Sequence, residues 1–227
     1  MKKLISTIMV LLILTGIANA QIVTTGNVNV RTGPGLEYDI IGSIPEGEAM
    51  YFYSYCTEAD ERGVDWYLAA CNELNGWVSS KYAQHYVFDG AVSAEEAEKY
   101  IDVSEYFDET IDAAAEKTGL KNYYRKNSDD APIVYFDKSL VIGRVDSKFM
   151  SITGPGYSIY GAAVGMNIDE ACEKLAEAGM TVFKEVDGSK SFHSPGFVGD
   201  AADWVEYDFM ISLEYENDTV RKIEWND

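Results

Sequence analysis

The chain has 227 residues and a formal net charge of −20. A surface this acidic repels phosphate backbones and anionic lipid head groups, so we expect neither nucleic-acid binding nor electrostatic docking to a membrane. The charged residues are dispersed rather than gathered in blocks, which is typical of the solvated surface of a globular protein.

The first twenty residues have the pattern of a secretory signal peptide. Lys2 and Lys3 precede an apolar run over residues 4–17, and Ala-Asn-Ala at residues 18–20 resembles a cleavage site. The run is shorter than the ~20 residues of a membrane span. We therefore expect a mature chain that starts at Gln21, is secreted into the extracellular space or the periplasm, and is not inserted in the membrane. Loss of the two lysines would change the charge from −20 to −22.

Three cysteines, Cys56, Cys71 and Cys172, are present and match no metal-binding spacing. Cys56 and Cys71 fall on segments that we expect to be neighbouring strands, and the sequence leaves open whether they form a disulfide. Cys172 shares a helical face with Ile168 and Leu175, so we expect a buried free thiol there.

Residues 21–88 show the alternation of short β-strands. Val28 and Val30 alternate with polar residues, and the Thr-Gly-Pro-Gly sequence at residues 32–35 predicts a turn. Apolar segments follow at residues 40–44, 49–56 and 64–70, the last two around a polar loop as in a hairpin. The pattern predicts an all-β domain of small strands.

Two motifs in this region resemble those of a bacterial SH3 domain: Asn-Val-Arg-Thr-Gly-Pro at residues 29–34 and Gly-Trp-Val at residues 76–78. The resemblance implies an SH3-like barrel that binds cell-wall peptides or glycans through an aromatic-lined groove. Two features depart from the family pattern, namely Gly35, where Ser or Thr is usual, and an unusually acidic distal loop.

The candidate ligand-binding residues carried by this resemblance are Tyr38, Asp65, Trp66 and Tyr82. Trp66 has an alternative interpretation, because a small barrel needs large side chains to fill its interior.

From about residue 92 the period changes from 2 to 3.6. Ser93 and Glu96 form a capping box, and apolar residues recur at helical spacing as far as Gly119, as one long helix or two short ones. Strands are predicted at residues 133–136, 139–145 and 148–153. A second helix capped by Asn167 and ended by Gly179 follows, with strands at residues 180–186, 204–215 and 219–225. The sequence thus predicts an α+β domain of helices on an antiparallel sheet over residues 92–227, with half-units at residues 92–153 and 154–227.

Residues 161–167, Gly-Ala-Ala-Val-Gly-Met-Asn, resemble a small α/β module of the type found in beta-lactamase inhibitor protein and in the small lipoprotein of the outer-membrane barrel-assembly machinery. The resemblance implies protein or envelope binding. Only the turn glycines Gly161 and Gly165 match the module, and their expected role is in the backbone conformation.

No arrangement of catalytic residues stands out. The one pair to consider for a cell-wall hydrolase is Cys172 with His193, but Glu170 and Glu173 beside the thiol would disfavour a thiolate. His-Glu-x-x-His and phosphate-binding loops are absent from the sequence. We therefore expect no catalytic residue, metal or cofactor.

The sequence favours a non-enzymatic protein that binds cell-wall peptide, glycan or an envelope protein through its SH3-like domain. The alternative is a protein inhibitor or assembly factor that acts through the C-terminal sheet face, and the third hypothesis is a cell-wall hydrolase.

Overall fold

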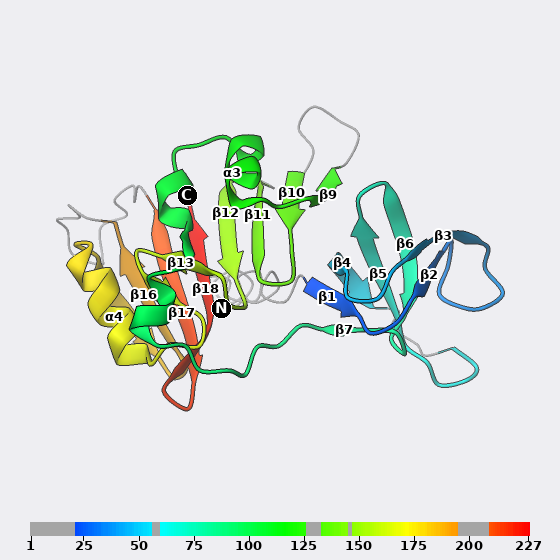
Figure 1. Ribbon diagram of the computed structural model, residues 1–227. Helices are drawn as coiled ribbons and strands as arrows, with labels where there is room; N and C mark the ends of the chain where they lie inside the picture. The colour runs from blue at the N-terminus through cyan, green and yellow to red at the C-terminus, as the bar shows by residue number, and fades with distance from the viewer. Residues whose placement is uncertain (1–20, 56–59, 126–132, 145–146, 195–208) are drawn as a thin grey trace, which may run out of the picture. The chain divides into compact units, whose positions relative to one another are not determined.

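The computed structural model describes residues 21–55, 60–125, 133–144, 147–194 and 209–227 (Figure 1). The chain divides into two compact units, one up to His85 and one from Tyr86 onward. The predicted signal segment and Cys56 lie outside the described residues, so the question of a Cys56–Cys71 bridge lies outside them too.

The N-terminal unit is one antiparallel sheet of seven strands in the order β3-β2-β6-β5-β4-β1-β7. The strands are β1 (Gln21–Thr24), β2 (Val28–Arg31), β3 (Ile40–Ile44), β4 (Ala49–Tyr55), β5 (Trp66–Cys71), β6 (Leu74–Ser79) and β7 (Ala83–His85).

Alternate residues of β2 and β6 contribute to the core of the unit. In β2, Val28 and Val30 are buried and Asn29 is exposed, as the period of two predicts. Their partners in the apolar cluster include Ile22, Met50 and Val78, each fully buried.

The C-terminal unit is built on an antiparallel sheet of eight strands in the order β15-β16-β17-β18-β12-β11-β10-β9 (Figure 1). Its strands are β9 (Asn122–Arg125), β10 (Ile133–Phe136), β11 (Leu140–Arg144), β12 (Lys148–Ile152), β15 (Thr181–Val186), β16 (Ser189–His193), β17 (Met210–Glu216) and β18 (Thr219–Asn226). The two runs of strands meet where β12 pairs with β18, in a register that places Met150 opposite Trp225.

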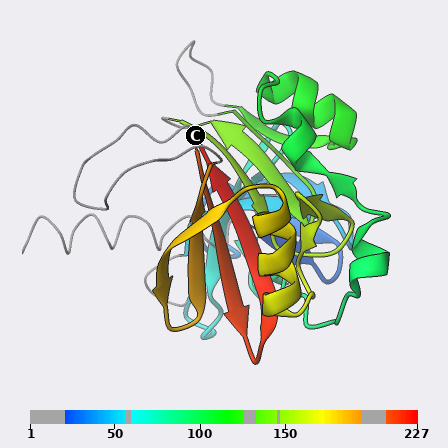
Figure 2. The ribbon, with the colours of Figure 1, turned by 90° about the vertical axis from the view of Figure 1, so that its left-hand side faces the viewer.

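Short helices and a small three-stranded sheet complete this unit. They are α2 (Ala94–Ala97), β8 (Ile101–Asp102), the 3₁₀ helix η1 (Val103–Tyr106), α3 (Ile111–Thr118), β13 (Tyr157–Ile159), β14 (Ala162–Ala163) and α4 (Ile168–Glu177). Helix α3 packs on β10 and β11, and α4 packs on β14 and β18. Figure 2 shows α4, in yellow, in front of the red and orange strands.

The predicted fold class, an SH3-like barrel followed by an α+β domain, is wrong. The chain is mostly β, with 47% strand and 15% helix, and the described residues contain three α-helices beside large antiparallel sheets. In the N-terminal unit, β3 and β7 end an open strand order. In the C-terminal unit, residues 93–119 alternate between two short α-helices, a strand and a 3₁₀ helix. The two short α-helices are one of the alternatives that the sequence left open, whereas the strand and the 3₁₀ helix between them were not predicted.

Helix α4 does form where the capping residues predicted it. The Asn167 side chain accepts a hydrogen bond from the Asp169 amide, and Gly179 follows the helix with a φ of 86°. Gly161 and Gly165 also have positive φ values, 77° and 93°, so glycine at these two positions allows the backbone conformation.

Candidate functional site

The segment between β2 and β3 is held in place by the first of the two motifs. The Arg31 guanidinium donates hydrogen bonds to the main-chain oxygens of Leu36, at 3.1 Å, and Tyr38, at 2.7 Å. The Tyr38 ring lies against Gly33, where a Cβ atom would come within 2.4 Å of the ring. The Arg and Gly of the motif therefore fix the conformation of this loop.

The same loop and the start of β3 expose four large apolar side chains, which we call the loop patch. Leu36 is 55% exposed, Tyr38 42%, Ile40 53% and Ile41 45%. Large apolar side chains exposed on one short stretch of the chain are typical of a contact site. The loop patch is the main candidate for a binding surface in the N-terminal unit.

The two motifs meet in the sheet. Arg31 of β2 pairs with Trp77 of β6, and a Cβ atom on Gly76 would come within 2.5 Å of the Arg31 main-chain oxygen. Only glycine allows this close approach of the two strands. The second motif thus supports the strand that carries Arg31.

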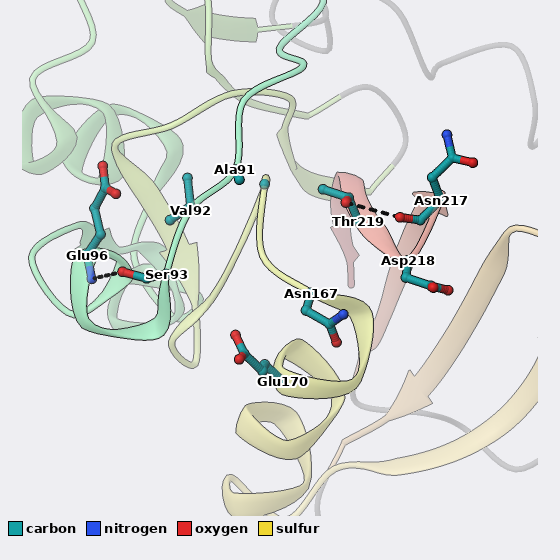
Figure 3. A pocket seen from close by; sticks show the side chains of 10 residues that line it. Ala91, Val92, Ser93, Glu96, Asn167, Glu170, Asn217, Asp218 and Thr219 are labelled. Atoms are coloured by element: carbon teal, nitrogen blue, oxygen red, sulfur yellow. Dashed lines mark hydrogen bonds between the residues drawn. The ribbon is translucent and has the colours of Figure 1, made fainter.

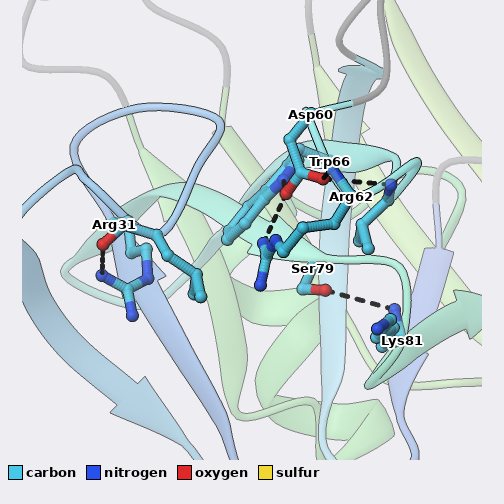
Figure 4. A network of polar contacts seen from close by, with 8 residues as sticks. Arg31, Asp60, Arg62, Trp66, Ser79 and Lys81 are labelled. Carbon is cyan, nitrogen blue, oxygen red and sulfur yellow. Dashed lines mark hydrogen bonds and ion pairs between the residues drawn. The ribbon is translucent and has the colours of Figure 1, made fainter.

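A carboxylate at the loop before β5, that of Asp60, is the centre of a group of polar contacts (Figure 4). Asp60 accepts hydrogen bonds from the amides of Arg62, at 2.9 Å, and Val64, at 3.1 Å. Its other oxygen accepts from the Trp66 indole, at 3.0 Å, and pairs with the Arg62 guanidinium. These charged and neutral donors hold the pKa of Asp60 well below its usual range, with the Arg62 guanidinium as the largest cause.

This network predicts acid sensitivity. A carboxyl whose pKa is lowered in the folded state stabilises the fold above its unfolded pKa, near 4, and that contribution is lost as the pH falls towards the folded value. Between about pH 5 and about pH 2 the wild-type N-terminal sheet should therefore lose stability more steeply than the Asp60→Asn variant. Thermal melts of both full-length proteins across this range test it, and parallel pH curves would contradict the role given to Asp60.

The four candidate residues from the sequence lie in different settings. Tyr38 and Asp65 are exposed, Tyr82 is 51% exposed, and Trp66 is 1% exposed with its indole bound to Asp60. Neither a hydrogen bond nor a ring contact joins Tyr38, Asp65 and Tyr82 to one another in the described part of the unit. Trp66 is therefore a core side chain, and its ring offers a ligand no exposed face.

Sequence reasoning missed Leu36, Ile40 and Ile41. Ile40 and Ile41 were interpreted as the apolar residues of a strand, but β3 is an edge strand and a shift of register against β2 occurs at Val30 and Arg31. The sequence did hold one signal for this exposure. Ile40 and Ile41 are adjacent, and consecutive residues of a strand point to opposite faces, so both cannot lie on the same buried face.

Cys172 and His193 lack the electrostatic features of a nucleophile and its base. Burial is the main cause that raises the pKa of the Cys172 thiol, and the charges of Asp169 and Glu185 raise it further against the opposing effect of Lys190. His193 is 3% exposed, and burial lowers the pKa of its imidazole. The pKa of the Cys172 thiol is thus raised, as expected from the sequence. The causes are burial and the carboxylates of Asp169 and Glu185, rather than those of Glu170 and Glu173.

Cys71 resembles Cys172 in this respect. Burial, aided by the charge of Glu48, raises the pKa of the Cys71 thiol to about 11. A thiol with such a pKa is almost fully protonated at neutral pH and is a poor nucleophile.

In the C-terminal unit a shallow depression of about 550 Å³ lies between the starts of α2 and α4 (Figure 3). Its lining includes Glu96, Glu170 and Asp218, with Ser93 and Asn167 as the caps of the two helices. Figure 3 shows Glu96 and Asp218 at opposite sides of the view, with Glu170 between them. The caps and first-turn acids already satisfy the helix starts, so this depression repels anions.

Over the part of the chain that the structure describes, no group of three or more His, Cys, Asp or Glu side chains is arranged to hold a metal ion. Within the same ranges, no helix is both long and apolar enough to cross a membrane. Neither a protein-family model nor a curated protein nor a solved structure matches this chain.

Proposed function

We propose that this chain is a secreted, non-enzymatic binding protein whose N-terminal unit binds cell-wall peptide, cell-wall glycan or an envelope protein through the loop patch. The single observation that carries the proposal is the exposure of Leu36 and Tyr38 on a loop that Arg31 holds in place, and of Ile40 and Ile41 at the start of β3.

Two properties make the loop patch suitable for binding. Its loop is ordered before a ligand arrives, because Arg31 bonds two of its main-chain oxygens, and a pre-ordered surface loses less entropy on binding. Its side chains combine an aromatic ring with aliphatic groups, and such residues provide much of the energy of most interfaces. The wall-derived ligand class comes from the resemblance of the two motifs to bacterial SH3 domains.

The non-enzymatic part of the proposal is supported by the two described cysteines. Both thiols have a raised pKa, which is the reverse of what a nucleophilic cysteine needs.

A co-sedimentation assay with purified peptidoglycan tests this function. In the full-length protein, the double variant Leu36→Ser/Tyr38→Ala should reduce the bound fraction by about tenfold or more, because loss of two contact residues commonly costs 1–2 kcal/mol each. Circular dichroism would establish that the variant is folded.

The matched control is Val182→Ser/Val186→Ser, which removes two aliphatic side chains that are 46% and 50% exposed on β15 of the other unit. This control should bind as the wild type does. Equal retention of the wild type and the loop-patch variant would exclude the loop patch as the wall-binding surface. If the wild type instead stayed in the supernatant with peptidoglycan and bound only an envelope protein, the same pair of variants would test binding to that protein.

A further inference from the structure

A second pocket lies in the C-terminal unit, separate from the loop patch, and has a volume of about 420 Å³. Four of its lining residues are aromatic, and we call them the aromatic wall: Phe107, Tyr160, Phe209 and Trp225. Ser104, Asp108 and Asp227 complete the lining. The pocket thus combines aromatic rings with two carboxylates.

The aromatic wall is tightly packed around Phe107. Its ring stacks on Trp225 with centroids 4.3 Å apart, and it contacts Tyr160 and Phe209 edge-on at 5.8 and 5.4 Å. Trp225 is 2% exposed, and its indole N–H has no hydrogen-bond acceptor among the described residues. A buried donor without an acceptor is costly, so the Trp225 N–H is a group of this pocket that the described residues leave without an acceptor.

Tyr160 is held in the pocket by a strained backbone. Its φ is 50°, a left-handed conformation that tyrosine rarely adopts, and the Asp102 carboxylate accepts hydrogen bonds from its amide, at 3.1 Å, and from the Gly161 amide, at 2.9 Å. Such conformations persist where the surrounding contacts impose them, and they are frequent at ligand sites.

One alkylammonium group already lies at the aromatic wall. The Lys148 ammonium is 5.5 Å from the centre of the Trp225 ring and donates to the main-chain oxygens of Phe107 and Glu109. The wall therefore has the geometry of a cation–π contact.

The charge around the pocket is negative despite this lysine. Three carboxylates, those of Asp227, Asp108 and Glu109, act on the Lys148 ammonium. Glu109 is also paired with Lys117. The two carboxylates that line the pocket thus exceed the one remaining ammonium, and the local field favours a cation.

We propose that this pocket binds a primary alkylammonium group, as in a free amine or a lysine side chain, with the ammonium beside the two lining carboxylates and the carbon chain against the aromatic wall. The electrostatic attraction selects the charge, and the exposed parts of Tyr160 and Phe209 cover the methylene groups.

Titration of the full-length, ¹⁵N-labelled protein with n-butylammonium chloride tests the proposal, with n-butanol as the neutral probe of similar size. The chain has four tryptophans, so the indole N–H signal of Trp225 can be assigned from its loss in Trp225→Phe. We expect n-butylammonium to shift this signal saturably and n-butanol to bind about tenfold more weakly or not at all. Nα-acetyl-lysinamide serves as the probe for a lysine side chain. If a lysine side chain fits the pocket, this probe should shift the Trp225 signal as n-butylammonium does. If only small free amines fit, n-butylammonium alone should shift it.

Two variants change the charge of the site in opposite directions. Asp108→Asn should weaken n-butylammonium binding by about fivefold, and Lys148→Met, which removes the resident ammonium, should strengthen it by a similar factor. Glu170→Gln, at the acidic depression by α4, is the matched control and should change nothing. Thermal melts would show which variants remain folded.

Equal binding of n-butylammonium and n-butanol, or no saturable shift with either, would overturn the proposal. Loss of binding in folded Lys148→Met together with saturable binding of acetate by the wild type would also overturn it, since the pocket would then be an anion site. None of these readouts depends on wall binding by the loop patch.

Discussion

Replacing Trp66 by alanine is expected to lower the free energy of unfolding of the N-terminal unit by about 3–5 kcal/mol. Trp66 is 1% exposed and is among the largest fully buried side chains of the protein, so the substitution leaves a large cavity. It also removes the indole donor to Asp60. Amide hydrogen exchange of β4, β5 and β6 in the full-length protein would measure the loss.

Two further variants separate the causes. Trp66→Phe keeps most of the packing but lacks the indole N–H, so it should lose about 1–2 kcal/mol through the lost hydrogen bond to the Asp60 carboxylate, which keeps its pairing with Arg62. Tyr82→Ala removes a half-exposed ring and should leave exchange nearly unchanged. If Trp66→Ala were as stable as Tyr82→Ala, the buried placement of Trp66 would be wrong.

The second large effect is expected at Asp102, whose replacement by alanine should cost about 3 kcal/mol in the C-terminal unit. Its carboxylate accepts from the Ser104 amide at 3.0 Å, the Ser104 hydroxyl at 2.6 Å, and the amides of Tyr160 and Gly161. It therefore ties the start of η1 to the turn after β13. Denaturant unfolding followed by tryptophan fluorescence would measure the change.

Two controls accompany this variant. Ser104→Ala removes only the hydroxyl contact and should cost about 1 kcal/mol. Asp187→Ala removes an exposed carboxylate from the turn between β15 and β16 and should have little effect. A cost for Asp102→Ala no greater than that for Asp187→Ala would mean that the four contacts do not stabilise the turn.

The sequence was most informative where a local rule decides the structure. The Val28 and Val30 alternation, the strand at Ile133–Phe136 and the capped helix α4 are all present. In each case short-range sterics, alternation of burial or a capping hydrogen bond selects the conformation without help from distant residues.

It failed where several structures satisfy one pattern. Over residues 93–119 the alternative of two short helices is present as α2 and α3, but the strand β8 and the 3₁₀ helix η1 between them fit the same apolar spacing and were not predicted. The number of strands in a sheet and its closure depend on pairing between distant segments, so the open order of the N-terminal sheet could not be read from turns and alternation.

The candidate sites show the same limit. The burial of Trp66 depends on which face of β5 it occupies, and the exposure of Tyr38 depends on how the loop between β2 and β3 is held, whereas the motif resemblance treated both as surface residues. The pocket at the aromatic wall joins η1, the turn at Tyr160, Phe209 and the end of β18. These segments are up to about 120 residues apart, and no local spacing in the sequence connects them.

The position of β18 constrains how the C-terminal unit folds. This strand follows every other described strand in the chain, yet it lies inside the sheet between β17 and β12. Its pairing partner Phe149–Ile152 lies more than 70 residues earlier in the chain. Until β18 is in place, the long edges of β12 and β17 remain open to water and to other chains, and contacts between distant segments form slowly. Synthesis as far as β18 must therefore precede assembly of this sheet, and the open edges of β12 and β17 favour aggregation until β18 docks.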